Sequence, residues 1–213
     1  MCVHLEEPGV GDNPGGPDSL GAGRGPDWSV MLLAMQQPTR GTIRVARPGR
    51  DHSALAILMS DYLRWALGQL ESEYGITDMP VDPDATVHSL DAYLPPGGLV
   101  VIAEVEGRAA GVGALRKLEP GVVEVKRMYV HPDHRNQHLA SGMLDVLLTQ
   151  ATATFQATTV RLDTCRFMHS AQRLYRSRGF EERPPYEGTE IPPRLQEYWM
   201  FFEKGLVPDV AAD

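Results

Sequence analysis

The sequence predicts an α/β fold in which a mixed, mostly antiparallel central sheet carries helices on both faces. Three strand-like segments at 99–106, 109–117 and 122–130 follow one another through tight turns, which is typical of an antiparallel meander. Amphipathic helical segments lie before and after this meander, and further strand-like segments follow. Apolar faces of helices and sheets must cover one another, so these segments favour a layered α/β domain.

The first elements follow a region dense in glycine and proline. We expect a strand at 42–46, a turn at 47–51 and then a helix. Its buried face is traced by apolar residues at helical spacing, namely Leu55, Leu58, Met59, Tyr62, Leu63 and Ala66. Between 71 and 98 the chain is expected to form a loop with a short helix near 86–93.

The third strand of the meander changes its alternation. Positions 123 and 125 are apolar, and so are 128 and 130, so the phase slips near Lys126 and Arg127. A bulge absorbs such a slip, and bulges concentrate next to active sites. The alternative is an ordinary twisted strand whose pattern is interrupted by Tyr129.

The stretch 124–140, EVKRMYVHPDHRNQHLA, predicts a strand that passes through a His-Pro-Asp turn into a helix. Helix entry is expected near His134, so that the first turn opens on Arg135. The apolar face of this helix is formed by Leu139, Met143, Leu144 and Leu147. The free N–H groups and positive dipole end of a helix bind anions, so this junction predicts a phosphate site.

The remaining elements are a strand at 158–164, a helix that ends at Gly179 and a closing strand at 197–204. Gly179 followed by Phe180 is typical of a helix C-terminus.

Two motifs resemble the GCN5-related N-acetyltransferase (GNAT) superfamily. In that family the phosphate loop reads Arg or Gln, two residues, Gly, one residue, then Gly or Ala, and here it reads RNQHLA from Arg135 to Ala140. The segment AQRLYRSRGF at 171–180 resembles the family's A-x-x-L-Y-x-x-x-G-F. The resemblance extends from about Thr42 to Lys204 and implies a GNAT-type sheet in a domain at 41–206. A disordered tail at 1–40 and a short tail at 207–213 would flank this domain.

The resemblance implies acetyl-CoA as co-substrate. The backbone of Met128 and Val130 would pair with the pantetheine arm, and the N–H of Met128 would hold the thioester carbonyl. The implied cofactor-binding residues are Met128, Tyr129, Val130, Arg135, Asn136, Gln137, His138, Leu139, Ala140 and Ser141.

Two positions depart from the family pattern. His138 stands where the family has glycine, which lets the backbone approach phosphate. We expect His138 to keep ordinary helical geometry, with its ring aside or donating to phosphate; a distorted site is the alternative. Met168 replaces an asparagine that contacts the cofactor in many relatives, so that hydrogen bond is absent or supplied by His169 or Ser170.

Acetyl transfer needs a neutral amine and a proton for the departing thiolate. These two requirements point to two candidate catalytic residues. Glu124 has the spacing of a general base in several relatives; a salt bridge with Lys126 or Arg127, or a solvated carboxylate at the sheet edge, is the alternative. Tyr175 would protonate the thiolate; the alternative is that Tyr175 is only an aromatic residue on the buried face of its helix. Direct transfer in a ternary complex is expected, since Cys165 has no evident activating partner for covalent catalysis.

No metal is expected, although His134 and His138 are four residues apart and His131 lies nearby. Zinc sites gather three or four ligands with supporting carboxylates or cysteines, and these histidines lie where phosphates would bind.

The acceptor would be set by the loops at 71–98 and 182–194. In the first, Glu73 and Tyr74 are candidates to line the acceptor pocket. Arg166 is a candidate to hold a carboxylate, and Glu187 or Glu190 an ammonium. An amine-bearing small molecule is favoured as acceptor; a protein lysine or N-terminus, or a non-catalytic acetyl-CoA sensor, are the alternatives.

Composition narrows the partners and the compartment. The 213 residues carry 28 acidic and 20 basic side chains, a net charge of −8, which disfavours nucleic-acid binding. Only Cys2 and Cys165 are present, so a reducing cytoplasm is expected. No secretory signal or membrane span is apparent, and no membrane partner is expected. Dimers are frequent in the superfamily, so a homodimer is one expectation.

Overall fold

A seven-stranded sheet forms the centre of the protein. The computed structural model describes residues 41–47, 49–83 and 90–206, and the expected tails at 1–40 and 207–213 lie outside these ranges. The described strands run in the order β1-β2-β3-β4-β5-β7-β6. Their bounds are β1 Thr42–Val45, β2 Gly98–Val105, β3 Arg108–Glu119, β4 Val122–Val130, β5 Thr159–Cys165, β6 Glu181–Arg183 and β7 Trp199–Gly205. Among them β4 and β5 pair in parallel and the other neighbours are antiparallel, as the sequence predicts.

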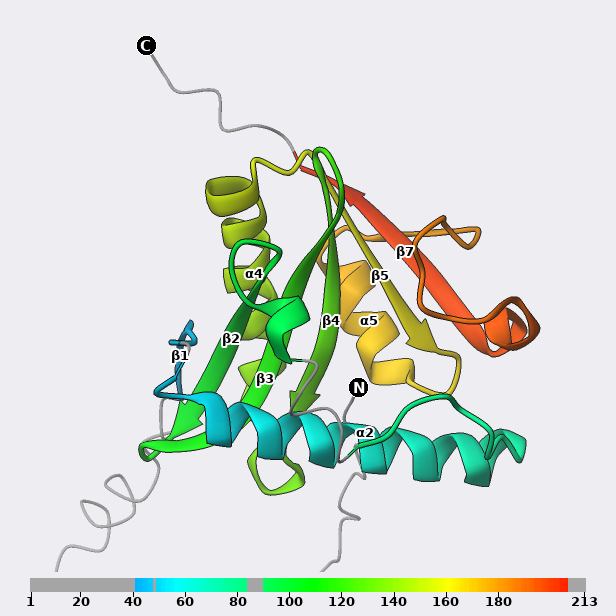
Figure 1. Ribbon diagram of the computed structural model, residues 1–213, viewed down its shortest axis with the longest axis horizontal. Helices are drawn as coiled ribbons and strands as arrows, with labels where there is room; N and C mark the ends of the chain where they lie inside the picture. The colour runs from blue at the N-terminus through cyan, green and yellow to red at the C-terminus, as the bar shows by residue number, and fades with distance from the viewer. Residues whose placement is uncertain (1–40, 48, 84–89, 207–213) are drawn as a thin grey trace, which may run out of the picture.

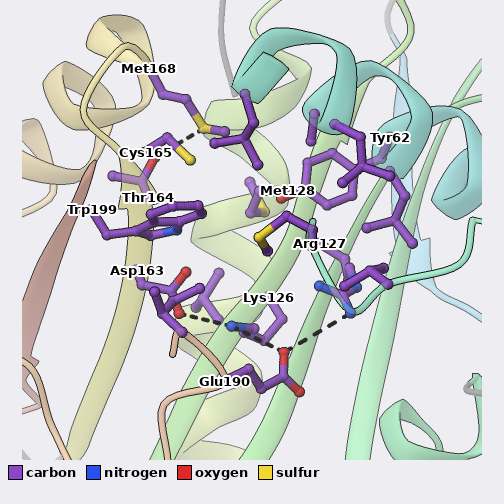
Figure 2. A pocket seen from close by; sticks show the side chains of 18 of the residues that line it. Tyr62, Lys126, Arg127, Met128, Asp163, Thr164, Cys165, Met168, Glu190 and Trp199 are labelled. Carbon is purple, nitrogen blue, oxygen red and sulfur yellow. Dashed lines mark hydrogen bonds and ion pairs between the residues drawn. The ribbon is translucent and has the colours of Figure 1, made fainter. Parts of the chain in front are cut away.

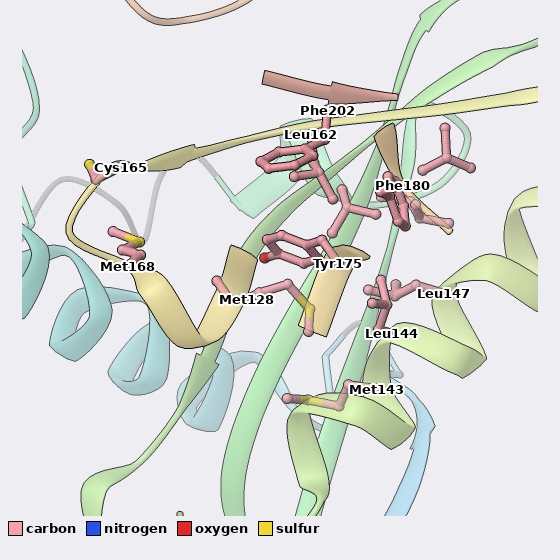
Figure 3. Close-up of a cluster of buried hydrophobic side chains, with 14 of the residues drawn as sticks. Met128, Met143, Leu144, Leu147, Leu162, Cys165, Met168, Tyr175, Phe180 and Phe202 are labelled. Carbon is pink, nitrogen blue, oxygen red and sulfur yellow. The ribbon is translucent and has the colours of Figure 1, made fainter. Parts of the chain in front are cut away.

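Helices cover both faces of this sheet, which confirms the predicted layers (Figure 1). Helix α2 (His52–Tyr74) packs on one face, where Leu55, Leu58 and Met59 join Val100 and Ile102 in a buried cluster. Helices α4 (Leu139–Phe155) and α5 (His169–Ser177) pack on the other. Figure 3 shows this second core, in which Met143, Leu144 and Leu147 of α4 and Tyr175 of α5 meet Met128, Leu162 and Phe202 of the sheet.

The predicted bulge in the third meander strand is confirmed. In the β3–β4 ladder Ala114 lies opposite Lys126 but Val112 lies opposite Tyr129, so β4 carries one extra residue there. Arg127 takes up the irregularity with a left-handed φ of 56°. A bulge redirects the side chains beside it. It thereby turns Arg127 and Met128 out of the regular alternation.

Strands β4 and β5 separate just before this bulge. Their parallel pairing runs from Val122 opposite Thr159 to Val125 opposite Leu162 and extends no further. Figure 1 shows the two strands diverging toward the end of the sheet that α2 crosses. Side chains from β4, β5 and the helices therefore meet at an opening in the sheet.

Several element boundaries differ from the sequence-based expectations. The prediction that the helix begins near His134 is wrong: Pro132–His134 forms a short 3₁₀ turn (η2), and α4 starts at Leu139. Strand β6 was not predicted. Of the expected short helix near 86–93, the described part Leu90–Tyr93 is a 3₁₀ turn (η1), and 84–89 lie outside the described residues.

Gly179 ends α5 as predicted, with a φ of 77° and a backbone bond from the N–H of Phe180 to the carbonyl of Tyr175. Within the described ranges, no helix is both long and apolar enough to cross a membrane.

Candidate active site

Two cavities open where β4 and β5 separate. The large cavity, of about 450 Å³, lies between the end of β4, the start of α4 and helix α5. It is lined by Met128, Tyr129, Val130, His134, Arg135, Asn136, His138, Leu139, Ala140, Ser141, Ser170, Ala171, Arg173, Leu174 and Tyr175. Of the ten predicted cofactor-binding residues, Gln137 is the one absent from this lining. The motif residues thus gather around one cavity.

The loop before α4 has a conformation that the sequence did not predict. Arg135 is extended, with a ψ of 166°, and Asn136 and His138 are left-handed, with φ values of 63° and 58°. The expectation that His138 keeps helical geometry is therefore wrong. It is the N-cap residue of α4, and its backbone takes a conformation that glycine adopts easily. Histidine is among the residues that tolerate this region, so the loop keeps its path without glycine.

Arg135 has a guanidinium nitrogen without a partner among the described residues in the part of the large cavity beside α4. Its Nε lies 3.5 Å from the carbonyl oxygen of Val130. Its Nη2 is buried and has no hydrogen-bond partner among the described residues. A buried guanidinium N–H without a partner is costly, so an anionic ligand beside α4 would relieve it.

The small cavity, of about 120 Å³, lies on the α2 side of the same opening (Figure 2). Helix α2 supplies a largely apolar wall, and the strands supply most of the charged groups. The lining residues are Tyr62, Leu63, Ala66, Leu67, Leu70, Met79, Val81, Val125, Lys126, Arg127, Met128, Asp163, Thr164, Cys165, Met168, Tyr175, Glu190, Ile191 and Trp199. Met128 and Tyr175 line both cavities, so these two residues stand at the junction.

A cluster of charges occupies one end of the small cavity (Figure 2). Lys126 Nζ lies 2.8 Å from Asp163 Oδ2 and 3.4 Å from Glu190 Oε2. Burial alone would lower the pKa of Lys126, but these carboxylates and Glu124 raise it overall. Burial likewise would raise the pKa of Glu190, but Lys126, Arg116 and Arg127 lower it. Lys126 and Glu190 are therefore both charged at neutral pH.

Glu124 lies outside both cavities. Its side chain is fully buried, and its carboxylate accepts hydrogen bonds from Arg116, at 2.5 Å and 3.1 Å, and from the hydroxyl of Tyr186, at 2.7 Å. Lys126 Nζ lies 3.6 Å from it, so the salt bridge considered from the sequence is present. Arg116 is the main partner because it lies directly opposite Glu124 in the β3–β4 hairpin.

Tyr175 is buried beside the junction of the cavities. Its ring packs against Phe180 and Phe202, with centroids 5.9 Å and 6.3 Å away. Figure 3 shows its hydroxyl directed away from Phe180, on the side of Met128. Tyr175 is thus a buried helix aromatic, the alternative considered from the sequence, and its hydroxyl lies at the junction of the cavities.

The remaining candidates from the sequence divide between the cavities and the surface. Glu190 lines the small cavity, whereas Glu73, Tyr74, Arg166 and Glu187 do not line either one. Tyr74 stacks on Tyr198, with centroids 4.7 Å apart, and Arg166 donates to the carbonyl of Glu197 at 2.7 Å.

Residues at the end of β5 and the start of α5 complete this picture. Met168 lines the small cavity and accepts a hydrogen bond from Thr164, Ser170 lines the large cavity, and His169 lines neither. Cys165 is buried in the small cavity wall, and burial raises the pKa of its thiol. In the described parts of the chain, His, Cys, Asp and Glu form no group of three that could hold a metal ion.

Comparisons with known proteins agree with this geometry. Residues 59–180 match the model of the acetyltransferase (GNAT) family. An uncharacterized N-acetyltransferase of Schizosaccharomyces pombe is 30% identical over 162 residues, covering 74% of this chain and 93% of that protein. The IAA acetyltransferase of Azospirillum brasilense is 31% identical over 127 residues, covering 58% of this chain and 80% of that protein.

Solved structures share the fold. A GNAT-family acetyltransferase of Staphylococcus aureus superposes with a TM-score of 0.60 at 18% identity, covering 78% of this chain and 99% of the other. A Salmonella typhimurium protein described as an acetyltransferase, and solved with its cofactor acetyl-CoA, has a TM-score of 0.58 at 22% identity, with 81% and 98% covered. With the family match and the S. pombe relative, the chain belongs to the acetyltransferase (GNAT) family and is an acyltransferase.

Proposed function

We propose that this protein is an N-acetyltransferase that moves the acetyl group of acetyl-CoA to a primary amine of a small molecule by direct transfer. The observation that carries the proposal is that Met128 and Tyr175 line both cavities. A donor in the large cavity and an acceptor in the small one would therefore meet beside these two residues. Cys165 is left out of the reaction because its raised pKa keeps the thiol protonated.

The large cavity fits acetyl-CoA, which would supply the activated acetyl thioester. Arg135 lines this cavity and has a buried Nη2 without a partner among the described residues, and Leu139 and Ala140 at the start of α4 line it too. Such a pair of features suits a pyrophosphate. Arg173 adds a second guanidinium to the same lining. The volume of about 450 Å³ is within the usual range of small-molecule sites.

Two groups of the chain would act at the reacting centre. The backbone N–H of Met128, redirected by the bulge, would donate to the carbonyl oxygen as it gains negative charge. The phenol of Tyr175 would give its proton to the departing thiolate. Phenols have a pKa of about 10 and cysteine-like thiols about 8.5, so positioning rather than acidity must favour this transfer.

The proton on the incoming amine would leave through Glu190. Asp163 and Glu190 are the carboxylates on the small cavity among the described residues, and Glu190 is the more solvent-exposed, at 39% against 9%. Its lowered pKa makes it a weak base that passes the proton on to water rather than keeping it. Glu124, which has no face on the cavity, would hold Arg116 and Lys126 in place.

A small acceptor suits the small cavity. Its volume of about 120 Å³ is close to that of cavities that admit benzene, about 150 Å³. A flat or open groove would suit a folded protein substrate better.

Release of the CoA thiol in the presence of amines tests this function, with Tyr175→Phe as the diagnostic variant. We expect wild-type turnover with at least one small amine and a kcat about a hundredfold lower in the variant. Tyr198→Phe is the matched control, because Tyr198 lines neither cavity. Acetyl-CoA binding without turnover of any amine would instead support an acetyl-CoA-binding regulatory module.

A further inference from the structure

We propose that the acceptor carries a carboxylate next to its amine and that Arg127 binds this carboxylate in the small cavity. An apolar α-amino acid is the simplest molecule of this class. The inference rests on the proposed function for the reaction, but the binding of the acceptor can be measured without turnover.

Arg127 is a desolvated cation with incomplete pairing. Its side chain is 17% exposed, its Nε is buried without a partner among the described residues, and the ring of Tyr93 lies 5.4 Å away. The nearest carboxylate oxygen recorded for it, on Glu190, is 4.0 Å from Nη2, at the limit of an ion pair. A buried charge without close partners is costly, so an arginine kept in a cavity wall points to an anion that arrives with a ligand.

The other two cations of the charge cluster are already well paired. Lys126 lies 2.8 Å from Asp163 and Arg116 lies 2.5 Å from Glu124. Both also approach Glu190, at 3.4 Å and 3.0 Å respectively. Counted over the described residues, Arg127 therefore has the weakest pairing of the three cations, and an incoming carboxylate would gain most by binding there.

Glu190 gives the same end of the cavity a site for an ammonium. An α-amino acid carries its ammonium and carboxylate on one carbon, so its two charges match a guanidinium and a carboxylate that are 4.0 Å apart. The zwitterion adds no net charge to a cluster whose three cations and three carboxylates already balance. In this pose the amine lies at Glu190, the carboxylate that we propose to accept its proton.

The opposite wall suits an apolar side chain. Leu63, Ala66, Leu67 and Leu70 of α2 line it, and Ile191, in the loop before β7, adds a further apolar group to the cavity. Aliphatic walls favour an aliphatic or aromatic side chain over a charged one, because they offer no partner to a buried charge. The whole cavity thus combines a zwitterion end with an apolar body.

Arg166 is the matched control for this inference. The sequence made it a candidate for a carboxylate, but it is exposed, donates to the carbonyl of Glu197 and lines neither cavity. Arg166→Met and Arg127→Met each remove one guanidinium group; the first lies outside the cavity and the second lines it.

The test is calorimetric titration of the full-length protein saturated with CoA, which cannot react. The probes are L-leucine, L-methionine and L-phenylalanine, each beside its decarboxylated amine (3-methylbutylamine, 3-(methylthio)propylamine and 2-phenylethylamine). We expect the amino acids to bind at least tenfold more tightly than their amines, as a charge-assisted bidentate contact implies. Arg127→Met should weaken amino-acid binding by about ten- to hundredfold and leave amine binding within about twofold. Arg166→Met should change neither, and Arg127→Lys should restore part of the loss.

The inference is overturned if none of the three amino acids binds, if the amines bind as tightly, or if Arg127→Met binds the amino acids as well as the wild type. Should Arg127→Met fail to fold in a thermal-unfolding control, the wild-type comparison of each acid with its amine decides alone. Acetyl-CoA added to the same samples separates the two proposals. If the amino acids bind but are not acetylated, the proposed function is contradicted and this inference stands. If the amines are acetylated and the amino acids are not, the proposed function stands and this inference is contradicted.

Discussion

Replacing Glu124 by glutamine should destabilise the protein far more than it slows acetyl transfer. The substitution keeps the side-chain shape and removes one negative charge from a fully buried site. The loss falls on Arg116, at 2.5 Å, and on Lys126, at 3.6 Å, while the hydroxyl of Tyr186 can still donate to the amide oxygen.

The size of the loss in unfolding free energy depends on the carboxylates that Arg116 and Lys126 still contact in the variant. Breaking a buried pair by removing one partner costs about 3–5 kcal/mol of unfolding free energy. Arg116 and Lys126 both retain Glu190, and Lys126 also retains Asp163, so neither cation is left alone. We therefore expect the lower end, about 3 kcal/mol. For a domain of this size that is a fall in Tm of about 6–12 °C.

The assay is urea unfolding followed by circular dichroism, with kcat measured on the same preparations. Glu187→Gln is the matched control, because Glu187 is exposed and lines neither cavity; it should stay within about 0.5 kcal/mol of wild type. We expect Glu124→Gln to retain kcat within about tenfold. Unchanged stability together with a kcat about a hundredfold lower would refute this reasoning and restore Glu124 as the general base.

Three further predictions follow from the structure. Cys165→Ala should keep kcat within about twofold in the same thiol-release assay, since the buried thiol is protonated; loss of turnover would indicate a covalent step. The folded-state pKa values of Glu104, Glu190 and Glu203 lie below the usual 4.5. The unfolding free energy should therefore be constant above about pH 5 and fall as the pH drops further. Acid titration followed by circular dichroism checks this, and a loss of stability between pH 6 and 8 would contradict it. His138→Gly should preserve acetyl-CoA affinity in calorimetry, because glycine adopts the same left-handed backbone, whereas His138→Val should weaken it about tenfold.

The fold could be read from the sequence because its patterns are local. Alternating and helical apolar spacing located the meander and the three helices, and the phase slip near Lys126 located the bulge that the ladder confirms. The start of α4 was misplaced because the left-handed backbone of Asn136 and His138 carries no strong local pattern when glycine is absent. Strand β6 was missed because three residues, Glu181–Arg183, show too little alternation.

The candidate site was predictable only where one motif supplies it. The loop at 135–140 and the segment at 171–180 that holds Tyr175 are each contiguous in the sequence, and all but Gln137 of the expected cofactor residues line the large cavity. The small cavity joins α2, β4, β5 and the loop at Glu190, so Asp163 and Arg127 could not be assigned to it from spacing.

The main partner of Glu124 could not be found from the sequence. A regular hairpin turning at Pro120 and Gly121 would place Lys117 opposite Glu124, whereas a register shift between Lys117 and Glu119 brings Arg116 there.

The measurement that tests the central claim most directly is calorimetric titration of the protein with acetyl-CoA, comparing wild type with Arg135→Ala. We expect micromolar binding by the wild type and an affinity about tenfold or more lower in the variant, because alanine removes the guanidinium that we place beside the pyrophosphate. Arg166→Ala, outside both cavities, should bind as the wild type does. Absence of wild-type binding at millimolar acetyl-CoA would contradict the account.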